Sequence, residues 1–369
     1  MHGGSFQRGG GASDEAPVSG VSCAAQDPRL FDIVVRHVGS AGPRQAAAVA
    51  AGLGLPVEAV IAAIYRAPTI LAAGLAPPLA ERLAAMLGGL GLAVDLVPAG
   101  TPIDRGPLLD VAVEIVDAAL ADAVAAAIGE FIGVTAEVAL ELLLTPPGMI
   151  LGSASAATVA ALGARLPAGS ATLTAIDPVA SRYALFAASL PDAERDAIAA
   201  IAPDIGGRRD DGIVATGLTR GEADRLWRRL SPYEGVRLVP EAFLRFNLEL
   251  VAADGDAAAL EALAGIPADD LPLLLDLLPV VIEERVPQAQ VHVRLCEFAA
   301  AGFTVTAHLA TFATTTLEIV AAPPAALGLV GAAPGSRLPL RLPPAGAQRA
   351  RVLRARLEAA GADVVQAAA

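Results

Sequence analysis

The feature that most constrains the fold of this chain is a cassette that recurs five times along it. Each copy ends in an alanine- and leucine-rich helix, a glycine turn and a valine-rich strand. The first ending is LAERLAAMLGGLGLAVDLVP, residues 79–98. Internal repetition at a spacing of tens of residues is the sequence signature of an array of small units. We therefore expect five consecutive units and number them one to five. The later endings read ATVAALGARLPAGSATLTAI, GEADRLWRRLSPYEGVRLVP, HVRLCEFAAAGFTVTAHLA and RARVLRARLEAAGADVVQ.

Unit one predicts the order of secondary structure in the cassette. The β-branched run FDIVV (31–35) is typical of a strand. Two short helices follow, separated at GLGLP (52–56), and Val57, Val60, Ile61 and Ile64 have the spacing of one apolar helical stripe. A strand, a helix and a closing strand complete a β-α-α-β-α-β order. We therefore predict an α/β (α+β) fold, in which each unit is a small three-stranded sheet covered by two or three helices.

The register of the repeat follows from fixed offsets. Four residues of unit one recur 79 positions later in unit two, and five recur 211 positions later in unit four. Unit three lacks the second helix, and unit five has GLVGAAPG in place of its first helical region, so both are predicted to be truncated. The matches to unit two are Gly54 with Gly133, Glu58 with Glu137, Ile61 with Leu140, and Pro68 with Pro147. The matches to unit four are Gly54 with Gly265, Pro56 with Pro267, Pro68 with Pro279, Gly91 with Gly302, and Val94 with Val305.

The predicted domains follow from this register. They are a disordered Gly/Ser-rich tail (1–28), unit one (29–98), unit two (108–177), truncated unit three (182–241), unit four (243–312) and truncated unit five (314–369).

Composition excludes several classes of function. The net charge of −13 argues against a nucleic-acid binder, which needs a basic surface. Mean hydropathy is +0.57, but the apolar stretch 46–64 is interrupted by glycine, proline and Glu58, so we expect no integral membrane span. The two cysteines, Cys23 and Cys296, do not make a disulfide framework. A cytoplasmic location is therefore expected.

Unit one resembles the C-terminal domain of ribosomal protein L7/L12. The shared features are a strand opening with Phe-Asp, the GLGL turn between two helices, the Ala-Pro that closes the second helix, and a final Ala/Leu helix, glycine and Val-rich strand (Phe31 to Val97). In that family the domain is a docking module that recruits translation factors through basic residues of its first two helices. The resemblance implies the same fold and a docking role here. The corresponding positions carry no basic side chain in this sequence and fall near Ser40, Gln45, Ala48 and Ala59.

Arginine clusters on two third helices are the candidate partner-binding residues. On an acidic protein, such basic faces could dock an acidic partner or the acidic surface of a sister unit. A solvated helix face is the alternative, with Trp227 in the core. The candidate residues are Arg225, Trp227, Arg228 and Arg229 in unit three and Arg349 and Arg356 in unit five.

No catalytic, cofactor-binding or metal-binding residue is predicted, and we expect no cofactor. Adjacent carboxylates such as Asp269 and Asp270 point apart in a helix or a strand, so they make a poor acid/base couple. His292 and Cys296 lie one helical turn apart and could hold half a zinc site, but a core thiol beside a surface imidazole is the simpler interpretation.

The repeat and the missing chemistry favour a non-enzymatic scaffold or adaptor. Its protein partners would bind the first two helices of units one, two and four, with units three and five as connectors. Three alternatives remain open: an enzyme or ligand-binding protein with a site at a cleft between units, a translation- or ribosome-associated factor, and a subunit of a membrane or envelope machine.

Overall fold

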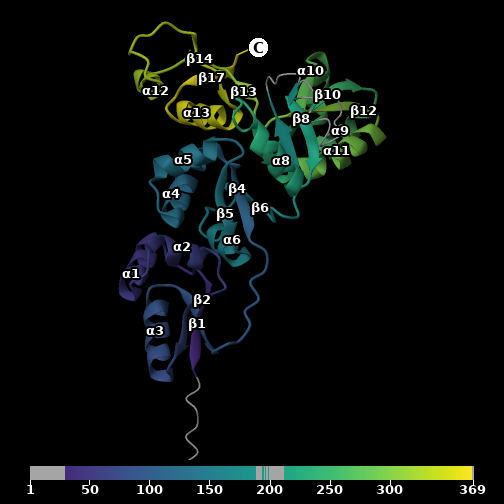
Figure 1. Ribbon diagram of the computed structural model, residues 1–369. Helices are drawn as coiled ribbons and strands as arrows, with labels where there is room; N and C mark the ends of the chain where they lie inside the picture. The colour runs from purple at the N-terminus through teal and green to yellow at the C-terminus, as the bar shows by residue number, and fades with distance from the viewer. Residues whose placement is uncertain (1–29, 188–192, 195, 197, 199–211, 368–369) are drawn as a thin grey trace, which may run out of the picture.

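The computed structural model describes residues 30–187, 193, 194, 196, 198 and 212–367. The predicted tail (1–28) lies outside these residues, as do most of residues 188–211 of unit three. The described chain is mixed α/β (Figure 1). Its strands form five three-stranded antiparallel sheets and one two-stranded pair, and in each three-stranded sheet the strand that comes first in sequence lies at the centre.

Unit one begins with a β-branched strand, and proline and glycine delimit its first two helices. Pro43 lies in the first turn of one helix, where a missing N–H costs little, and Gly54 ends that helix in the left-handed conformation (φ 65°). Val60 and Ile64 of the next helix are buried, as the apolar stripe predicts. The elements are β1 (Phe31–His37), α1 (Pro43–Leu53), α2 (Val57–Tyr65), β2 (Thr69–Leu75), α3 (Pro77–Gly89) and β3 (Ala93–Pro98).

Unit two has the same order of elements, and hydroxyl side chains cap two of its helices. Thr135 Oγ1 accepts a hydrogen bond from the N–H of Val138, and Ser155 Oγ accepts one from the N–H of Thr158. Gly133 ends the first helix at the position of Gly54. The elements are β4 (Leu109–Ile115), η1 (Ala118–Leu120), α4 (Ala121–Ile132), α5 (Ala136–Leu144), β5 (Met149–Ala154), α6 (Ala156–Gly163) and β6 (Ala171–Ile176).

Unit four repeats the order, and its first two helices are shorter than those of units one and two. Asp256 caps the first of them by accepting from the N–H of Ala258 at 3.3 Å, and Gly265 ends it with a φ of 67°. The elements are β10 (Arg245–Ala253), α9 (Ala257–Ala264), η3 (Ala268–Asp270), α10 (Leu271–Asp276), β11 (Val280–Pro287), α11 (Gln288–Ala300) and β12 (Phe303–Leu309).

Units three and five keep the three-stranded sheet and its third helix. Unit five differs from the prediction because a short helix, α12, begins four residues before GLVGAAPG, where Pro323 and Pro324 form its start and Ala326 and Leu327 are buried. The strand that pairs beside β14, within LPLRL (338–342), has only two residues. The elements are β7 (Tyr183–Phe186), β8 (Ile213–Leu218), α8 (Arg220–Leu230), β9 (Arg237–Pro240) and η2 (Glu241–Phe243) in unit three, and β13 (Thr314–Thr315), β14 (Leu317–Ala321), α12 (Pro324–Leu329), β15 (Leu340–Arg341), β16 (Ala345–Gly346), α13 (Ala347–Ala359) and β17 (Asp363–Gln366) in unit five.

One polar device recurs in units one, two and four. The second strand is bulged at a residue with positive φ, and a residue near the start of the central strand supplies an oxygen that binds the N–H of that residue. In unit three alanine (Ala184) stands at this position, and Glu241 Oε1 binds the corresponding Gly217 N–H instead. The three recurring bonds join Asp32 Oδ1 to Gly74 N (2.8 Å), Asp110 Oδ1 to Ser153 N (3.1 Å) and Asn247 Oδ1 to Arg285 N (3.0 Å).

The units pack against one another, and alternate residues of the central strands serve two cores. In β4, Val113 and Ile115 face the helices and belong to a core shared with unit one, whereas Ala112 faces units three and four. In β7, Leu185 and Phe186 divide in the same way between the core of unit three and the core shared with units two and four. The sheets of units two, three and four are therefore joined through their helix-free faces.

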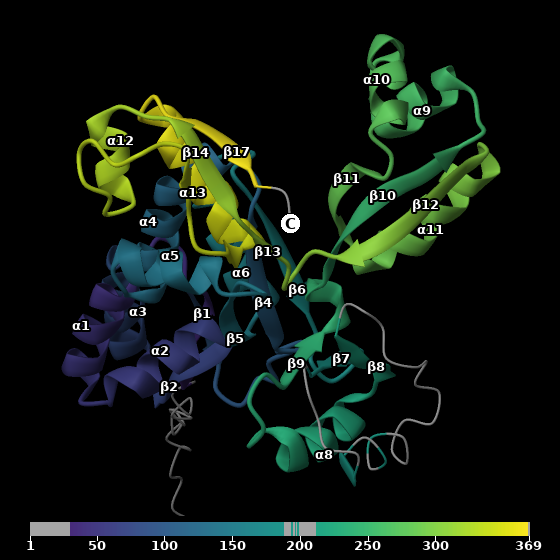
Figure 2. The ribbon, with the colours of Figure 1, turned by 90° about the horizontal axis from the view of Figure 1, so that it is seen from above.

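The order of the units in space differs from their order in the chain. Unit five returns to unit two, where Val352 of α13 enters the core shared by units one and two. Figures 1 and 2 both show α13 beside α4 and α5, with unit one below unit two in Figure 1. Units one, two and five thus form one stack, and unit four branches from it.

Candidate functional site

Unit two contacts one edge of the first two helices of unit one. The Tyr65 hydroxyl at the end of α2 donates to the carbonyl of Phe131, and the two rings stack with centroids 5.5 Å apart. Burial raises the pKa of Tyr65 to about 12. Thr158 Oγ1 donates to the Tyr65 carbonyl (2.9 Å), and Arg165 donates to the carbonyls of Gly39 (3.0 Å) and Ala41 (2.9 Å). The helix pair of unit one is therefore an interface inside the chain.

The first two helices of unit two are contacted by α13 of unit five. Arg349, a predicted partner-binding residue, donates to both carboxylate oxygens of Glu141 at 3.0 and 2.5 Å, and this pairing holds the pKa of Glu141 below its usual range. Arg356, another predicted residue, pairs with Asp122. Gln348 Nε2 also donates to the carbonyl of Ile115 (2.9 Å). These two arginines thus bind the acidic surface of a sister unit within the chain.

The two interfaces use the same positions of the third helix. Thr158 and Arg349 are each the third residue after their helix N-cap, and Arg165 and Arg356 are each the tenth. In α13 the two positions lie seven residues apart on one face of the helix, whereas in unit two Arg165 follows the end of α6 at Gly163. The sixth residue lies between them, and in α13 it is the buried Val352. A third helix of one unit docking on the helix pair of another is therefore a recurring contact in this chain.

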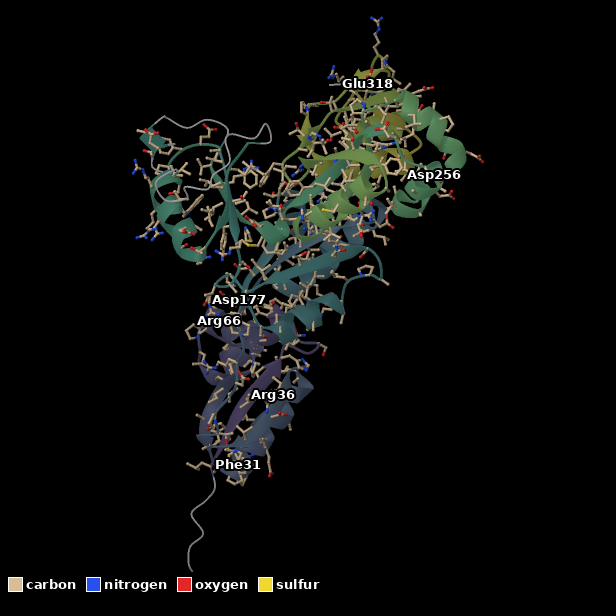
Figure 3. All side chains as sticks on the ribbon, turned by 90° about the vertical axis from the view of Figure 1, so that its right-hand side faces the viewer. Phe31, Arg36, Arg66, Asp177, Asp256 and Glu318 are labelled. Atoms are coloured by element: carbon tan, nitrogen blue, oxygen red, sulfur yellow. The ribbon has the colours of Figure 1, made fainter. Side chains whose placement is uncertain are left out.

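The helix pair of unit four, α9–α10, is left open. α9 packs against η3 and α11, and α10 packs against η3, all of unit four. Leu273 and Leu277 of this pair are 66% and 61% exposed. Residues 254–276 also contain six carboxylates and no arginine (Asp254, Asp256, Glu261, Asp269, Asp270 and Asp276). Figure 2 shows the pair projecting from the molecule, and Figure 3 places Asp256 at its outer edge.

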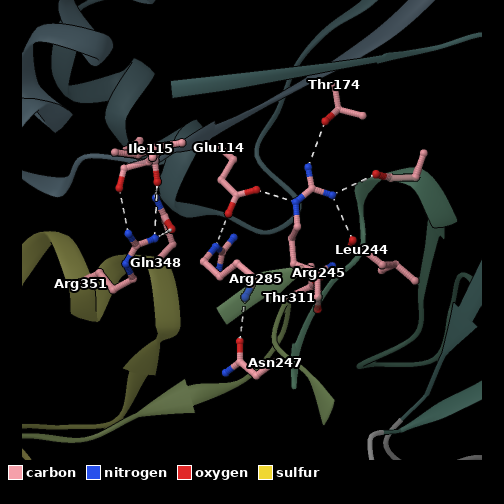
Figure 4. Close-up of polar contacts among 12 residues, drawn as sticks. Glu114, Ile115, Thr174, Leu244, Arg245, Asn247, Arg285, Thr311, Gln348 and Arg351 are labelled. Atoms are coloured by element: carbon pink, nitrogen blue, oxygen red, sulfur yellow. Dashed lines mark hydrogen bonds and ion pairs between the residues drawn. The ribbon is translucent and has the colours of Figure 1, made fainter. Parts of the chain in front are cut away.

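A buried ion triad fixes the branch that carries this open pair. Glu114 of β4 accepts from Arg245 Nε at 2.5 Å and pairs with Arg285 through its other oxygen (Figure 4). Arg245 also donates to Thr174 Oγ1 (3.0 Å) and to the carbonyl of Leu244 (3.0 Å). The side chains of Arg245, Arg285 and Glu114 are 7%, 17% and 15% exposed. The triad therefore locks unit four to the central strand of unit two.

The predicted residues of unit three remain at the surface of α8. Arg225, Arg228 and Arg229 are exposed, and Trp227 is 42% exposed, so the alternative that placed Trp227 in the core is wrong. Arg229 and Tyr233 both bind Glu194 of the same unit, which lowers the pKa of Glu194. Their role in partner binding stays a prediction. The sequence did not reveal the ion triad, because Arg245 and Arg285 lie outside the two predicted arginine clusters. It also did not reveal that Leu273 and Leu277 are exposed.

Two cavities lie between units, as a cleft-binding function would require. One of about 540 Å³ lies between units four and five, and its Arg354 is paired with Glu358. Another of about 730 Å³ lies between units one and two, beside Arg165. Within the described residues no group of three or more His, Cys, Asp or Glu side chains is arranged to hold a metal ion. His292 Nε2 lies 3.8 Å from Cys296 Sγ, and Cys296 is exposed, so its interpretation as a core thiol is wrong.

Among the described residues no single helix is long and apolar enough to span a membrane, whereas 118–132 and 136–144 together have the length and composition for a span but are bent by 110°. No family model, curated protein or solved structure matches the chain.

Proposed function

We propose that the chain is an array of five related modules resembling the L7/L12 C-terminal domain, and that it works as a non-enzymatic scaffold for protein partners. The recurrence of the sheet order and of the bulge-binding oxygen in units one, two and four supports the modular interpretation. Three of the modules have a helix pair, and two of these pairs already bind a third helix from a neighbouring unit.

The observation that carries the proposal is the open helix pair of unit four. Leu273 lies eight residues after the cap glycine Gly265, and Glu141, which binds Arg349 in unit two, lies eight residues after Gly133. The position that contacts a docked helix in unit two is thus an exposed leucine in unit four. Exposed apolar side chains within a polar rim mark protein interaction sites. Unit four therefore binds a helical partner face, while units one, two, three and five form the rigid support.

A photo-crosslinking amino acid at position 273 tests this function in the native cell. We expect a discrete crosslinked species, which disappears when Leu277→Asp is added. The same amino acid at position 329, where Leu329 is 53% exposed on α12 of unit five, is the control. Equal crosslinking at both positions, or none at position 273, would contradict the proposal.

A further inference from the structure

The stack of units one, two and five ends on a second uncovered surface. In α3 of unit one, Leu79 is the third residue after the N-cap Ala76, and Met86 is the tenth. These are the positions at which α6 and α13 contact the helix pairs of units one and two. Leu79 and Met86 are 49% and 46% exposed. The docking face of α3 is thus formed but has no helix pair against it among the described residues.

The chemistry of this face matches the open pair of unit four. The third residue after the N-cap is Arg349 in α13, and it binds Glu141 of unit two. In α3 the same position is Leu79, and the residue of unit four that corresponds to Glu141 is Leu273. A charged pair in one interface would therefore be an apolar pair in the other. Position six of α3 is Arg82, and no carboxylate lies at position three, six or ten. This single positive charge suits a helix pair that contains six carboxylates and no arginine.

The two surfaces cannot meet within one molecule. α3 and α10 lie at opposite ends of the molecule in both Figure 1 and Figure 2. Figure 3 likewise separates Phe31 of unit one from Asp256 of unit four. A contact between two different surfaces on the same chain is heterologous, and such contacts join copies head to tail.

We propose that a second copy of this chain occupies α9–α10, with α3 of one copy docked on the helix pair of unit four of the next. This inference rests on the proposed function and names the partner. The contact repeats the arrangement of the two interfaces inside the chain, so each copy presents a donor face on α3 and an acceptor face on α9–α10. Copies therefore associate into linear or ring-shaped assemblies that grow with concentration.

Sedimentation velocity on the purified full-length chain tests the proposal with two complementary variants. We expect the wild type to form a concentration-dependent series of species above the 37.0 kDa monomer. Leu79→Asp and Leu273→Asp should each weaken association by about a hundredfold, because each places a charge in an apolar contact. An equimolar mixture of the two variants should form a dimer and nothing larger, since each retains the face that the other has lost. Leu329→Asp is the matched control and should associate like the wild type.

Three results would overturn the proposal. These are a wild type that stays monomeric up to about 1 mM, the range of weak association, single variants that associate like the wild type, and a mixture that remains monomeric. Circular dichroism checks that each variant is folded, and Leu79→Ser and Leu273→Ser replace any that is not. A monomeric wild type that still gives a crosslink at position 273 to a different protein would leave the scaffold function standing and remove self-association alone.

Discussion

Removing Glu114 should uncouple unit four from unit two. Glu114→Ala leaves the guanidinium groups of Arg245 and Arg285 without their carboxylate in a site where all three side chains are at most 17% exposed. Loss of one partner of a buried ion pair costs about 3 to 5 kcal/mol. Arg245 keeps its bonds to Thr174 and to two backbone carbonyls, so we expect the lower end, about 3 kcal/mol.

Urea unfolding followed by circular dichroism measures this loss, with the exposed pair between Arg354 and Glu358 as the reference. These two side chains are 50% and 47% exposed, and Glu358→Ala should cost about 0.5 kcal/mol. Replacing Glu114 and both of its arginines by Met should recover much of the stability, because apolar side chains carry no unpaired charge. The reasoning is refuted if Glu114→Ala costs no more than Glu358→Ala.

Three further predictions concern the interfaces and turns of units one and two. Tyr65→Phe should lower the free energy of unfolding by about 1 kcal/mol, because it leaves the carbonyl of Phe131 without its donor. Because the pKa of Tyr65 in the folded protein is about 12, the stabilisation by this hydroxyl should be complete below pH 10 and lost as the pH rises through 12. A spectroscopic tyrosine titration checks this. Arg349→Ala should lower the free energy of unfolding by about 0.5 kcal/mol at neutral pH. Since the pKa of Glu141 is lowered, this loss should vanish as the pH falls below the usual carboxyl range. Urea unfolding midpoints of the wild type and the variant at each pH measure the difference. Gly39→Ala should destabilise by more than Gly54→Ala in thermal unfolding, since both have positive φ but a Cβ at position 39 would also overlap a backbone carbonyl, whereas position 54 is open.

The local structure of the units could be predicted from the sequence, because the periodicity of the apolar residues and the positions of proline and glycine indicate the same helices and strands. Proline and glycine delimit α1 and α2, and the matched prolines Pro68, Pro147 and Pro279 all precede a second strand, each in the cis form. The six-residue helix α12 was missed because it covers two turns at most and lacks a periodic apolar pattern. Bulge-binding residues such as Asp32 carry no distinctive local signal and emerge only from the register of the repeat.

The arrangement of the units could not be predicted, because it depends on contacts between distant residues. Arg349 and Arg356 of α13 were recognisable as a basic face, but their carboxylate partners Glu141 and Asp122 lie 208 and 234 residues away. The return of unit five to unit two is what covers α4 and α5 and leaves α9–α10 open. The role of Arg285 could likewise not be predicted, since it depends on Glu114 in another unit. The one available signal was the acidic, arginine-free composition of residues 254–276.

Hydrogen exchange of the three helix pairs, followed by mass spectrometry on dilute and concentrated protein, tests the central claim most directly. Amides of packed helices exchange slowly because exchange requires local opening. In dilute protein we expect α9–α10 to exchange faster than α1–α2 and α4–α5, which units two and five cover. At high concentration, α9–α10 and α3 should gain protection while the other two pairs stay unchanged. Equal exchange of all three pairs at both concentrations would contradict the claim that the chain covers two docking surfaces and presents the third.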